Sequence, residues 1–333
     1  MTLVVLPGAA AGQETPVPHR RRGGVPGASE NHVARGRCFP LGNGGMEEAI
    51  SIRGLRKVFR SGAVRVSSVV ALEGLDLSVR RGEVFGLLGP NGSGKSTTIK
   101  ICLDLVRATA GECLVFGQGT SRPATRARLG YVPEAPFFYA YLTGRGVVAS
   151  MGRFSGLSGK DLEERTNRAI RTVGLEGAED RPIRTYSKGM LQRLGLAQAL
   201  VHDPDLVILD EPTAGVDPIG ARQITELIRL LRSEGKTILL CSHLLSQVES
   251  VCDRVAILHR GRKIAEGTLG SLLERTGRRR SLAFGDEATY GKAKRVLAEA
   301  GLPAEEDGGG SLEEVFVSLV REGEAKAGRE GAA

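Results

Sequence analysis

Short apolar runs alternate with helix-like segments along most of the chain after residue 48. Runs such as LVILD (206–210) and TILLC (237–241) are apolar throughout and as short as strands, which is typical of strands buried on both faces of a parallel sheet. The segments between them carry apolar residues at every third or fourth position, as helices packed on such a sheet do. The chain is therefore expected to be an α/β protein with a mostly parallel sheet flanked by helices.

The expected elements follow from these patterns. Strands are predicted at 49–55, 75–79, 83–89, 128–134, 206–210, 237–243 and 254–261. Helices are predicted at 95–106, 187–201, 218–234 and 244–252. Residues 143–175 have a helical pattern without strands, including one helix from Ser158 to Val173. We expect a helical subdomain over about 135–186, inserted in an α/β domain over 46–267.

The N-terminal end of the chain differs in composition from this domain. Residues 1–45 are rich in Gly, Pro and Ala and lack periodicity. Their arginines follow the apolar TLVVL, which reverses the order found in a signal peptide. We interpret this stretch either as a disordered tail or as an extension ahead of a true start at Met46, with the second favoured. It is kept out of the fold prediction.

Residues 268–333 are expected to form a small C-terminal α/β module. RSLAF (280–284) is typical of a strand, and GKAKRVLAEAGL (291–302) of an amphipathic helix. In SLEEVFVSLV (311–320), Ser311 and Glu314 form a capping box ahead of an apolar stripe that includes Phe316. The stripe either packs on a core or binds a partner, and core packing is the default interpretation.

Composition narrows the classes of function. No apolar run approaches the roughly 20 residues that span a bilayer, so the chain is not expected to cross a membrane by itself. The net charge of +8 comes from scattered Lys and Arg, and aromatic residues make up only 4% of the chain, so no nucleic-acid partner is expected. Solvated charged faces and attraction to an anionic surface both remain open. The five cysteines show no metal-binding spacing, which suits reduced thiols in a cytosolic core.

A glycine-rich loop is the strongest chemical signal. LLGPNGSGKSTT follows a predicted strand and opens a predicted helix, and it fits the pattern G-x-x-x-x-G-K-[ST] from Gly89 to Ser96. In such a loop backbone amides point at phosphates, Lys95 reaches the β- and γ-phosphates, and the Ser96 hydroxyl binds Mg²⁺. The strand–loop–helix context favours this interpretation over a structural glycine turn. The predicted nucleotide contacts are Gly89, Pro90, Asn91, Gly92, Ser93, Gly94, Lys95, Ser96 and Thr97.

Two later strands end in groups that suit phosphate chemistry. LVILD ends at Asp210, predicted to bind Mg²⁺, and the next residue, Glu211, is placed to orient or deprotonate water. The alternative, a charge pair at a helix N-terminus, is weaker beside a phosphate loop. TILLCSH ends at His243, for which a γ-phosphate contact is favoured over a purely structural role. ATP and Mg²⁺ are the expected cofactors.

Four motifs together define a family resemblance. The phosphate loop, YSKGM (186–190), LVILDEPTAGVDP (206–218) and CSH (241–243) resemble the nucleotide-binding subunit of an ATP-binding cassette (ABC) transporter over roughly residues 48–267. The resemblance implies a P-loop NTPase fold and an ATPase that converts ATP and water to ADP and phosphate. It implies Lys95, Glu211 and His243 as catalytic residues. It also implies two partners, a second copy of the chain and a separate polytopic membrane permease.

The resemblance implies that the segment YSKGM binds the ATP held by the other copy of the chain. In a head-to-tail dimer, Ser187 and Gly189 are expected to face the γ-phosphate held by the partner's phosphate loop. Lys188 stands where the family commonly has a second glycine, and it either adds charge to the site or points to solvent. Asp217, in AGVDP, resembles the D-loop aspartate that communicates across the dimer.

The family resemblance also implies roles for Phe59 and Glu134, each of which leaves a question open. Phe59, in KVFRSG, stands where the family stacks an aromatic ring on adenine, and the alternative is an ordinary core phenylalanine. Glu134, in GYVPE, stands where the family usually has a glutamine that helps to hold Mg²⁺ and couples to the membrane subunit. Glu134 is therefore a candidate nucleotide and metal residue that brings an extra negative charge.

YVPE, YSKGM and the terminal SLEEVFVSLVRE together resemble the ATPase subunits of type 2 ABC exporters. The expected function is ATP-driven dimerisation that powers export through the permease, by a cytoplasmic protein peripheral on the inner face of the cell membrane. One alternative is an ABC ATPase that acts on ribosomes or DNA, although the second cassette or coiled-coil insertion of such relatives is missing. Another is a nucleotide-binding regulator without turnover, which the complete set of hydrolytic groups disfavours.

Overall fold

A computed structural model describes residues 2–5, 48–61, 67–275, 280–283, 287–299, 304–306, 316–317 and 320. The chain divides into two compact units, one of residues 1–45 with 280–306 and one of residues 46–279 with 307–333. The domain boundaries predicted after residues 45 and 267 stay predictions. The larger unit contains every predicted site residue.

The smaller unit contains an antiparallel sheet and a helix. In this sheet β1 (Thr2–Val5) lies between β12 (Arg280–Ala283) and β13 (Ala304–Glu306), and α9 (Glu287–Glu299) connects the two outer strands. The strand predicted at 280–284 is confirmed as β12, and α9 overlaps the predicted helix at 291–302. The sequence pattern does not predict β1, because both of its partners lie near the other end of the chain.

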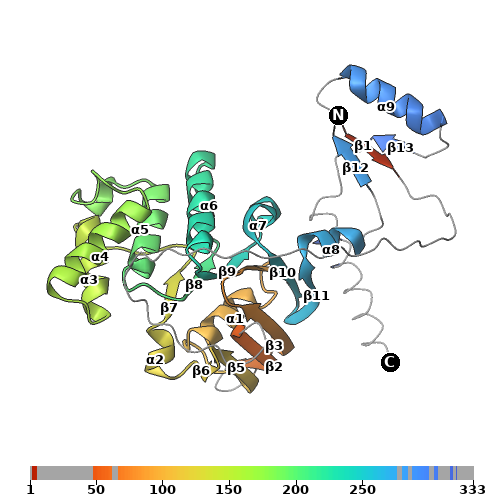
Figure 1. Cartoon of the computed structure of the whole chain (residues 1–333). Helices are drawn as coiled ribbons and strands as arrows, with labels where there is room; N and C mark the ends of the chain where they lie inside the picture. The colour runs from red at the N-terminus through yellow and green to blue at the C-terminus, as the bar shows by residue number, and fades with distance from the viewer. Residues whose placement is uncertain are drawn as a thin grey trace, which may run out of the picture. The chain divides into compact units, whose positions relative to one another are not determined.

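Six strands form the main sheet of the larger unit, in the order β11-β10-β4-β9-β8-β7 (Figure 1). β4 and β9 are buried along their whole length, as strands covered on both faces must be. The mostly parallel sheet is confirmed. The parallel strands are β4 (Val84–Leu88), β7 (Leu129–Val132), β8 (Leu206–Asp210), β9 (Thr237–Ser242) and β10 (Arg254–His259), and β11 (Arg262–Thr268) is an antiparallel edge.

A second sheet of the larger unit is antiparallel, in the order β3-β2-β5-β6. Its strands are β2 (Glu48–Ser61), β3 (Ser67–Arg80), β5 (Ala110–Val115) and β6 (Gln118–Gly119). The sequence pattern predicts only shorter strands at 49–55 and 75–79. β2 and β3 extend further because irregularities break their alternation: the register shifts between Ile52 and Leu55, and Gly54 between them has φ +55°.

The predicted helices are present, with shifted ends. α3, α4 and α5 lie together on one side of the larger unit, where the helical insertion is expected (Figure 1). α1 ends at Cys102 rather than 106, because the amides of Leu105 and Val106 both donate to the Lys100 carbonyl and close the helix. The helices are α1 (Lys95–Cys102), α2 (Pro123–Arg126), α3 (Gly144–Phe154), α4 (Gly159–Thr172), α5 (Lys188–Leu200), α6 (Pro218–Ser233), α7 (Leu245–Val251) and α8 (Leu269–Arg275).

The main sheet separates two hydrophobic cores. Val84 and Leu88 of β4 face a core shared with α3 to α7, whereas Phe85 and Leu87 face a core shared with α1, β2 and β3. Phe316 packs on the first core, which favours core packing for this part of the C-terminal stripe; Ser311 and Glu314 lie outside the described residues. None of the helices in the described ranges is long and apolar enough to span a bilayer.

We expect Gly130→Ala to separate α5 from β7. A Cβ at residue 130 would lie 2.6 Å from the carbonyl oxygen of Ala199 in α5, so the helix must shift to admit it. The substitution should lower the free energy of unfolding by about 1–3 kcal/mol, measured by urea denaturation. Gly119→Ala in β6, where a Cβ meets nothing within 4 Å, should change it by less than about 0.5 kcal/mol. Equal effects of the two substitutions would contradict this packing.

Candidate nucleotide-binding site

At both ends of the loop between β4 and α1, the backbone conformation and the surrounding atoms require glycine. Gly89 has φ +155° and Gly94 has φ +109°. A Cβ at residue 89 would lie 2.4 Å from the Leu258 carbonyl oxygen, and one at residue 94 would lie 2.7 Å from the Leu72 side chain. Both conformation and close packing therefore exclude a side chain. The loop runs directly into the N-terminus of α1, where backbone amides attract anions.

Lys95 and Ser93 supply polar groups to this loop. Lys95 is buried, and its ammonium donates to the carbonyl of Gly89 at 2.5 Å and to that of Pro90 at 3.3 Å. The Ser93 hydroxyl is also buried, and among the described residues it has no hydrogen-bond partner. A buried cation and an unsatisfied hydroxyl in a loop that opens a helix fit a phosphate group.

Glu211 and His243 meet just beyond the ends of β8 and β9. These strands pair in parallel, with Asp210 opposite Cys241, so the residues that follow emerge side by side. The Glu211 carboxylate accepts the backbone amide of His243 at 3.2 Å and lies 2.8 Å from His243 Nδ1. Glu211 is buried and has φ +48°, whereas the His243 side chain is half exposed. The structure therefore brings these two predicted catalytic residues together.

Asp210 lies in a strongly charged environment. Burial, followed by the negative charges of Glu211 and Glu134, raises the pKa of the Asp210 carboxyl above its usual value, and Lys95 opposes this shift. Residues from β8, the end of β7 and the phosphate loop are thus close enough for their charges to interact. Burial likewise raises the pKa of the neighbouring Tyr131 to about 12, with Asp210 as the second cause. The cost of an ionised Asp210 makes this edge a favourable place for a cation.

Gln247 is a site residue that sequence reasoning missed. Its side-chain carbonyl accepts hydrogen bonds from the hydroxyls of Thr213, at 3.0 Å, and Ser242, at 3.2 Å. All three side chains are buried, so the amide ties the segments that carry Glu211 and His243 to each other. The only local signal is a polar residue on the buried face of a short helix.

Gln192 is a second missed residue. It is buried in α5, and its side-chain amide donates to the backbone carbonyl of Glu134 at 2.9 Å. The Glu134 side chain itself is exposed. α5 begins within YSKGM (186–190), which is called the signature segment from here on. This helix is therefore attached to the turn after β7, a connection that no local pattern indicates.

Ser187 and Asp217 cap the two helices α5 and α6. The Ser187 hydroxyl accepts the Met190 amide at 3.3 Å, and the Asp217 carboxylate accepts the Gly220 amide at 2.9 Å. Gly189 is buried against Val216, 3.3 Å from where its Cβ would be. α5 packs on β7, α3, α4 and α6, whereas α1 packs on β3 and β5, and the two helices stand apart in Figure 1. Ser187 and Gly189 thus begin a helix remote from the one that Lys95 begins.

Phe59 lies near the end of β2 and is not a core residue. Its ring is 40% exposed, pairs across the strand with Val69, and has the Lys57 ammonium 4.8 Å from its centre. An exposed aromatic face on a β-sheet is available for stacking.

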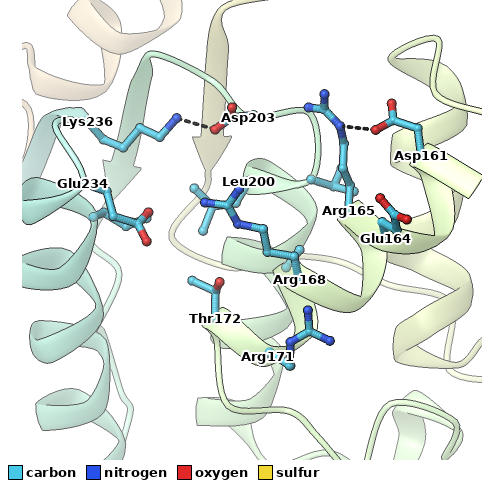
Figure 2. Close-up of a pocket in the computed structure, with 13 residues that line it drawn as sticks. Asp161, Glu164, Arg165, Arg168, Arg171, Thr172, Leu200, Asp203, Glu234 and Lys236 are labelled. Carbon is cyan, nitrogen blue, oxygen red and sulfur yellow. Dashed lines mark hydrogen bonds and ion pairs between the residues drawn. The ribbon is translucent and has the colours of Figure 1, made fainter. Parts of the chain in front are cut away.

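A charged cavity of about 510 Å³ lies elsewhere, between α4 and the C-terminal ends of α5 and α6 (Figure 2). Its lining includes two ion pairs, Arg165 with Asp161 and Lys236 with Asp203. Lys236 precedes β9, so the cavity is at the amino ends of the parallel strands, opposite the phosphate loop. None of the predicted nucleotide residues lines it.

Comparison with known proteins identifies the class. The family model for ABC transporters matches residues 72–214. The daunorubicin/doxorubicin resistance ATP-binding protein of Streptomyces peucetius is 40% identical over 257 residues, 76% of this chain and 78% of that protein. The Nod factor export ATP-binding protein I of Ralstonia nicotianae is 38% identical over 231 residues, 68% of this chain and 70% of that protein.

Solved structures agree. The ATP-binding subunit of an ABC transporter superposes with a TM-score of 0.63 and 29% identity, covering 81% of this chain and 99% of that one. CbiO1 of Clostridium perfringens, part of the ABC transporter complex cbiONQ, superposes with a TM-score of 0.60 and 28% identity, covering 69% and 92%. The chain belongs to the ABC transporter ATP-binding family. It is an ATP-binding P-loop ATPase, and its relatives include ATP-binding proteins of the type 2 exporter kind.

We expect Asp210→Asn to stabilise the nucleotide-free fold at neutral pH. Because the folded-state pKa of Asp210 is raised, the ionised carboxylate costs folding free energy above this pKa, and the cost vanishes below the unfolded-state pKa of about 3.9. Urea midpoints between about pH 4 and 7.5 should show a gain that shrinks as the pH falls. Asp161→Asn, at an exposed ion pair, should change stability by less than about 1 kcal/mol. A gain that grows towards acid pH would contradict the sign.

Proposed function

We propose that this chain is the ATP-hydrolysing subunit of an exporter, in which two copies close head to tail on ATP and drive a separate membrane subunit. One observation carries the proposal. The phosphate-loop helix α1 and the signature helix α5 belong to different parts of the larger unit, so a single copy offers each segment without the other (Figure 1). The exporter class is supported by the similarity to a Nod factor export ATP-binding protein.

In this proposal hydrolysis uses the cluster at the ends of β4, β8 and β9. Glu211 deprotonates or orients the attacking water, and the His243 amide and ring hold its carboxylate. With Nδ1 engaged by Glu211, the other ring nitrogen of the half-exposed His243 is free to contact the γ-phosphate. Lys95 moves its ammonium from the loop carbonyls to the β- and γ-phosphates, and residues 89–97 supply the surrounding contacts.

The residues present fit Mg²⁺ as an ion shared with the nucleotide. In the described part of the chain no group of three His, Cys, Asp or Glu side chains could hold a metal by itself. Mg²⁺ is commonly bound through one or two carboxylates together with substrate phosphates. Asp210, Ser96 and Glu134 are the proposed protein ligands, and bound Mg²⁺ would neutralise charge on the phosphates.

The remaining residues complete the nucleotide site across the dimer. Phe59 is proposed to stack on adenine, which its exposed ring permits. Ser187 and Gly189 are proposed to meet the γ-phosphate held by the other copy. Asp217 is proposed to lie at the same interface, in addition to capping α6. Because ATP then contacts both copies, it stabilises the closed dimer, and hydrolysis releases it.

Three exposed aromatic residues are the proposed docking surface for the membrane subunit. Phe137, Tyr139 and Tyr141 are 84%, 60% and 72% exposed and contact one another in series, with ring centres 6.0 and 5.7 Å apart. Phe137 stands three residues after Glu134, so a partner seated here would lie close to the edge of the proposed nucleotide site. An exposed apolar cluster of this kind marks a protein interface. The chain would thus lie on the inner face of the membrane.

We expect two inactive variants to restore each other's activity when mixed. Lys95→Ala removes a phosphate contact, and Ser187→Glu places a negative charge at the exposed start of α5; each alone should lose ATPase activity by about 100-fold or more. In a mixed dimer, the intact phosphate loop of one copy meets the intact signature of the other. Phosphate release should therefore recover on mixing.

The matched control for this experiment mixes Lys95→Ala with Glu211→Gln. Both substitutions affect the phosphate-loop half of a site, so no composite site is complete and activity should stay low. If Lys95→Ala and Ser187→Glu fail to complement, or if the wild-type chain hydrolyses ATP at full rate as an isolated monomer, the dimer mechanism is wrong.

We expect the wild-type chain to co-purify with a polytopic membrane protein in detergent. Combining Tyr139→Ser and Tyr141→Ser should abolish this association and leave nucleotide binding unchanged, because the docking surface loses most of its apolar area. Phe154→Ser, which removes an aromatic side chain that is 87% exposed on α3, is the control and should have no effect. Recovery of the wild-type chain without any membrane protein would contradict the proposed association with a membrane subunit.

A further inference from the structure

Lys188 lies against the loop that connects β8 to α6. A Cβ built on Gly215 would lie 2.2 Å from Lys188 Nζ and 3.4 Å from its Cε, so the ammonium occupies the space that a side chain at residue 215 would need. The Lys188 side chain is exposed, and its ammonium lies over this loop rather than extending away from it. We propose that Lys188 is a positioning residue that links the signature segment to Glu211 of the same chain. This inference rests on the proposed function.

The loop beneath Lys188 begins at the catalytic carboxylate. The Ala214 amide donates to the Glu211 carbonyl at 3.0 Å, and the Val216 amide donates to the Thr213 carbonyl at 3.1 Å. These two turns make residues 211–216 one compact unit. A movement of the backbone at Gly215 is therefore expected to move Glu211 as well, because these two turns join the residues between them. Gly215 itself has φ +64°, a backbone conformation that favours glycine.

The signature segment holds the same loop at a second point. Val216 packs against Gly189, so consecutive residues of the signature, 188 and 189, contact consecutive residues of the loop, 215 and 216. A glycine at position 188 could not make the first of these contacts. The lysine therefore adds a connection that the usual family sequence lacks.

The charge of Lys188 makes this connection responsive to phosphate. Among the described residues, none forms a hydrogen bond or ion pair with its ammonium, and the first turn of α5 contains no acidic residue. A cation at a helix N-terminus is unfavourable without an anion nearby. When the other copy's γ-phosphate reaches Ser187, it attracts the ammonium that lies over Gly215, and the loop shifts with the ammonium to position Glu211 for hydrolysis. Occupancy of one site then adjusts hydrolysis at the other.

The first test removes the charge of Lys188 and measures the rate of ATP hydrolysis. In Lys188→Gln we expect kcat to fall by about fivefold or more while KM stays within about twofold, with a weaker sigmoidal dependence on ATP. Lys188→Arg, which keeps the charge and the reach, should retain most of kcat. Lys160→Gln, at an exposed lysine in the first turn of α4, is the control and should match wild type.

The second test is a double-mutant cycle between the two contacting residues. Gly215→Ala displaces Lys188 as well as straining the backbone, whereas in a Lys188→Gly background only the strain remains. We expect kcat to fall at least about threefold more for Gly215→Ala in the wild-type background than in the Lys188→Gly background. Gly177→Ala, at an exposed glycine with φ +78° and open space around it, shows the cost of strain alone and should be additive with Lys188→Gly.

ATP-dependent dimerisation of Glu211→Gln variants separates the two proposals. If a Glu211→Gln chain dimerises on ATP while Lys188→Gln leaves kcat and cooperativity unchanged, or the cycle is additive, the linking role of Lys188 is wrong and the dimer stands. If no Glu211→Gln chain dimerises, with or without Lys188→Gln, the proposed function itself fails. Loss of kcat in Lys188→Gln that Lys188→Arg does not rescue would also overturn the linking role.

Discussion

The parallel pairing of β4, β9 and β8 is the constraint on which the site depends. Parallel strands deliver their carboxyl ends to one edge of the sheet, and each of these three strands continues there into a polar segment. The phosphate loop, Glu211 and His243 are far apart in the sequence and are brought together by backbone hydrogen bonds. The proposed catalytic groups are therefore held by the sheet more than by contacts among themselves, and the two cores on its faces support their positions.

Several departures from ordinary local rules gather at this edge. Glu211 has a positive φ, the Ser93 hydroxyl is buried without a partner among the described residues, and the Asp210 carboxyl has a raised pKa. Each lowers the stability of the isolated fold. The occurrence of all three at one edge of the sheet is consistent with a functional site.

α5 connects the helical side of the larger unit to two loops at the sheet edge that carries Glu211 and His243. Gln192 holds the turn that carries Glu134, and Gly189 and Lys188 contact the loop that begins at Glu211. Close packing of the same helix on β7 at Gly130 leaves little room for independent movement. A force applied near Glu134, next to the exposed aromatic residues, would therefore act on the signature segment through α5. This arrangement suits a protein that couples nucleotide chemistry to a partner.

The class of fold, the phosphate loop and the acidic strand end at Asp210 and Glu211 were predictable from the amino-acid sequence alone. These features are local: an apolar run predicts a buried strand, and glycine spacing predicts a loop whose amides face an anion. Other features became visible only in the three-dimensional fold: the bulged antiparallel sheet, the pairing of β1, the contact between Glu211 and His243, and the hydrogen bonds of Gln192 and Gln247. The same holds for the contact of the exposed Lys188 with Gly215, which the sequence does not predict. Contacts between residues distant along the chain depend on how the helices and strands pack against one another. The hydrophobic periodicity of the sequence does not specify that packing.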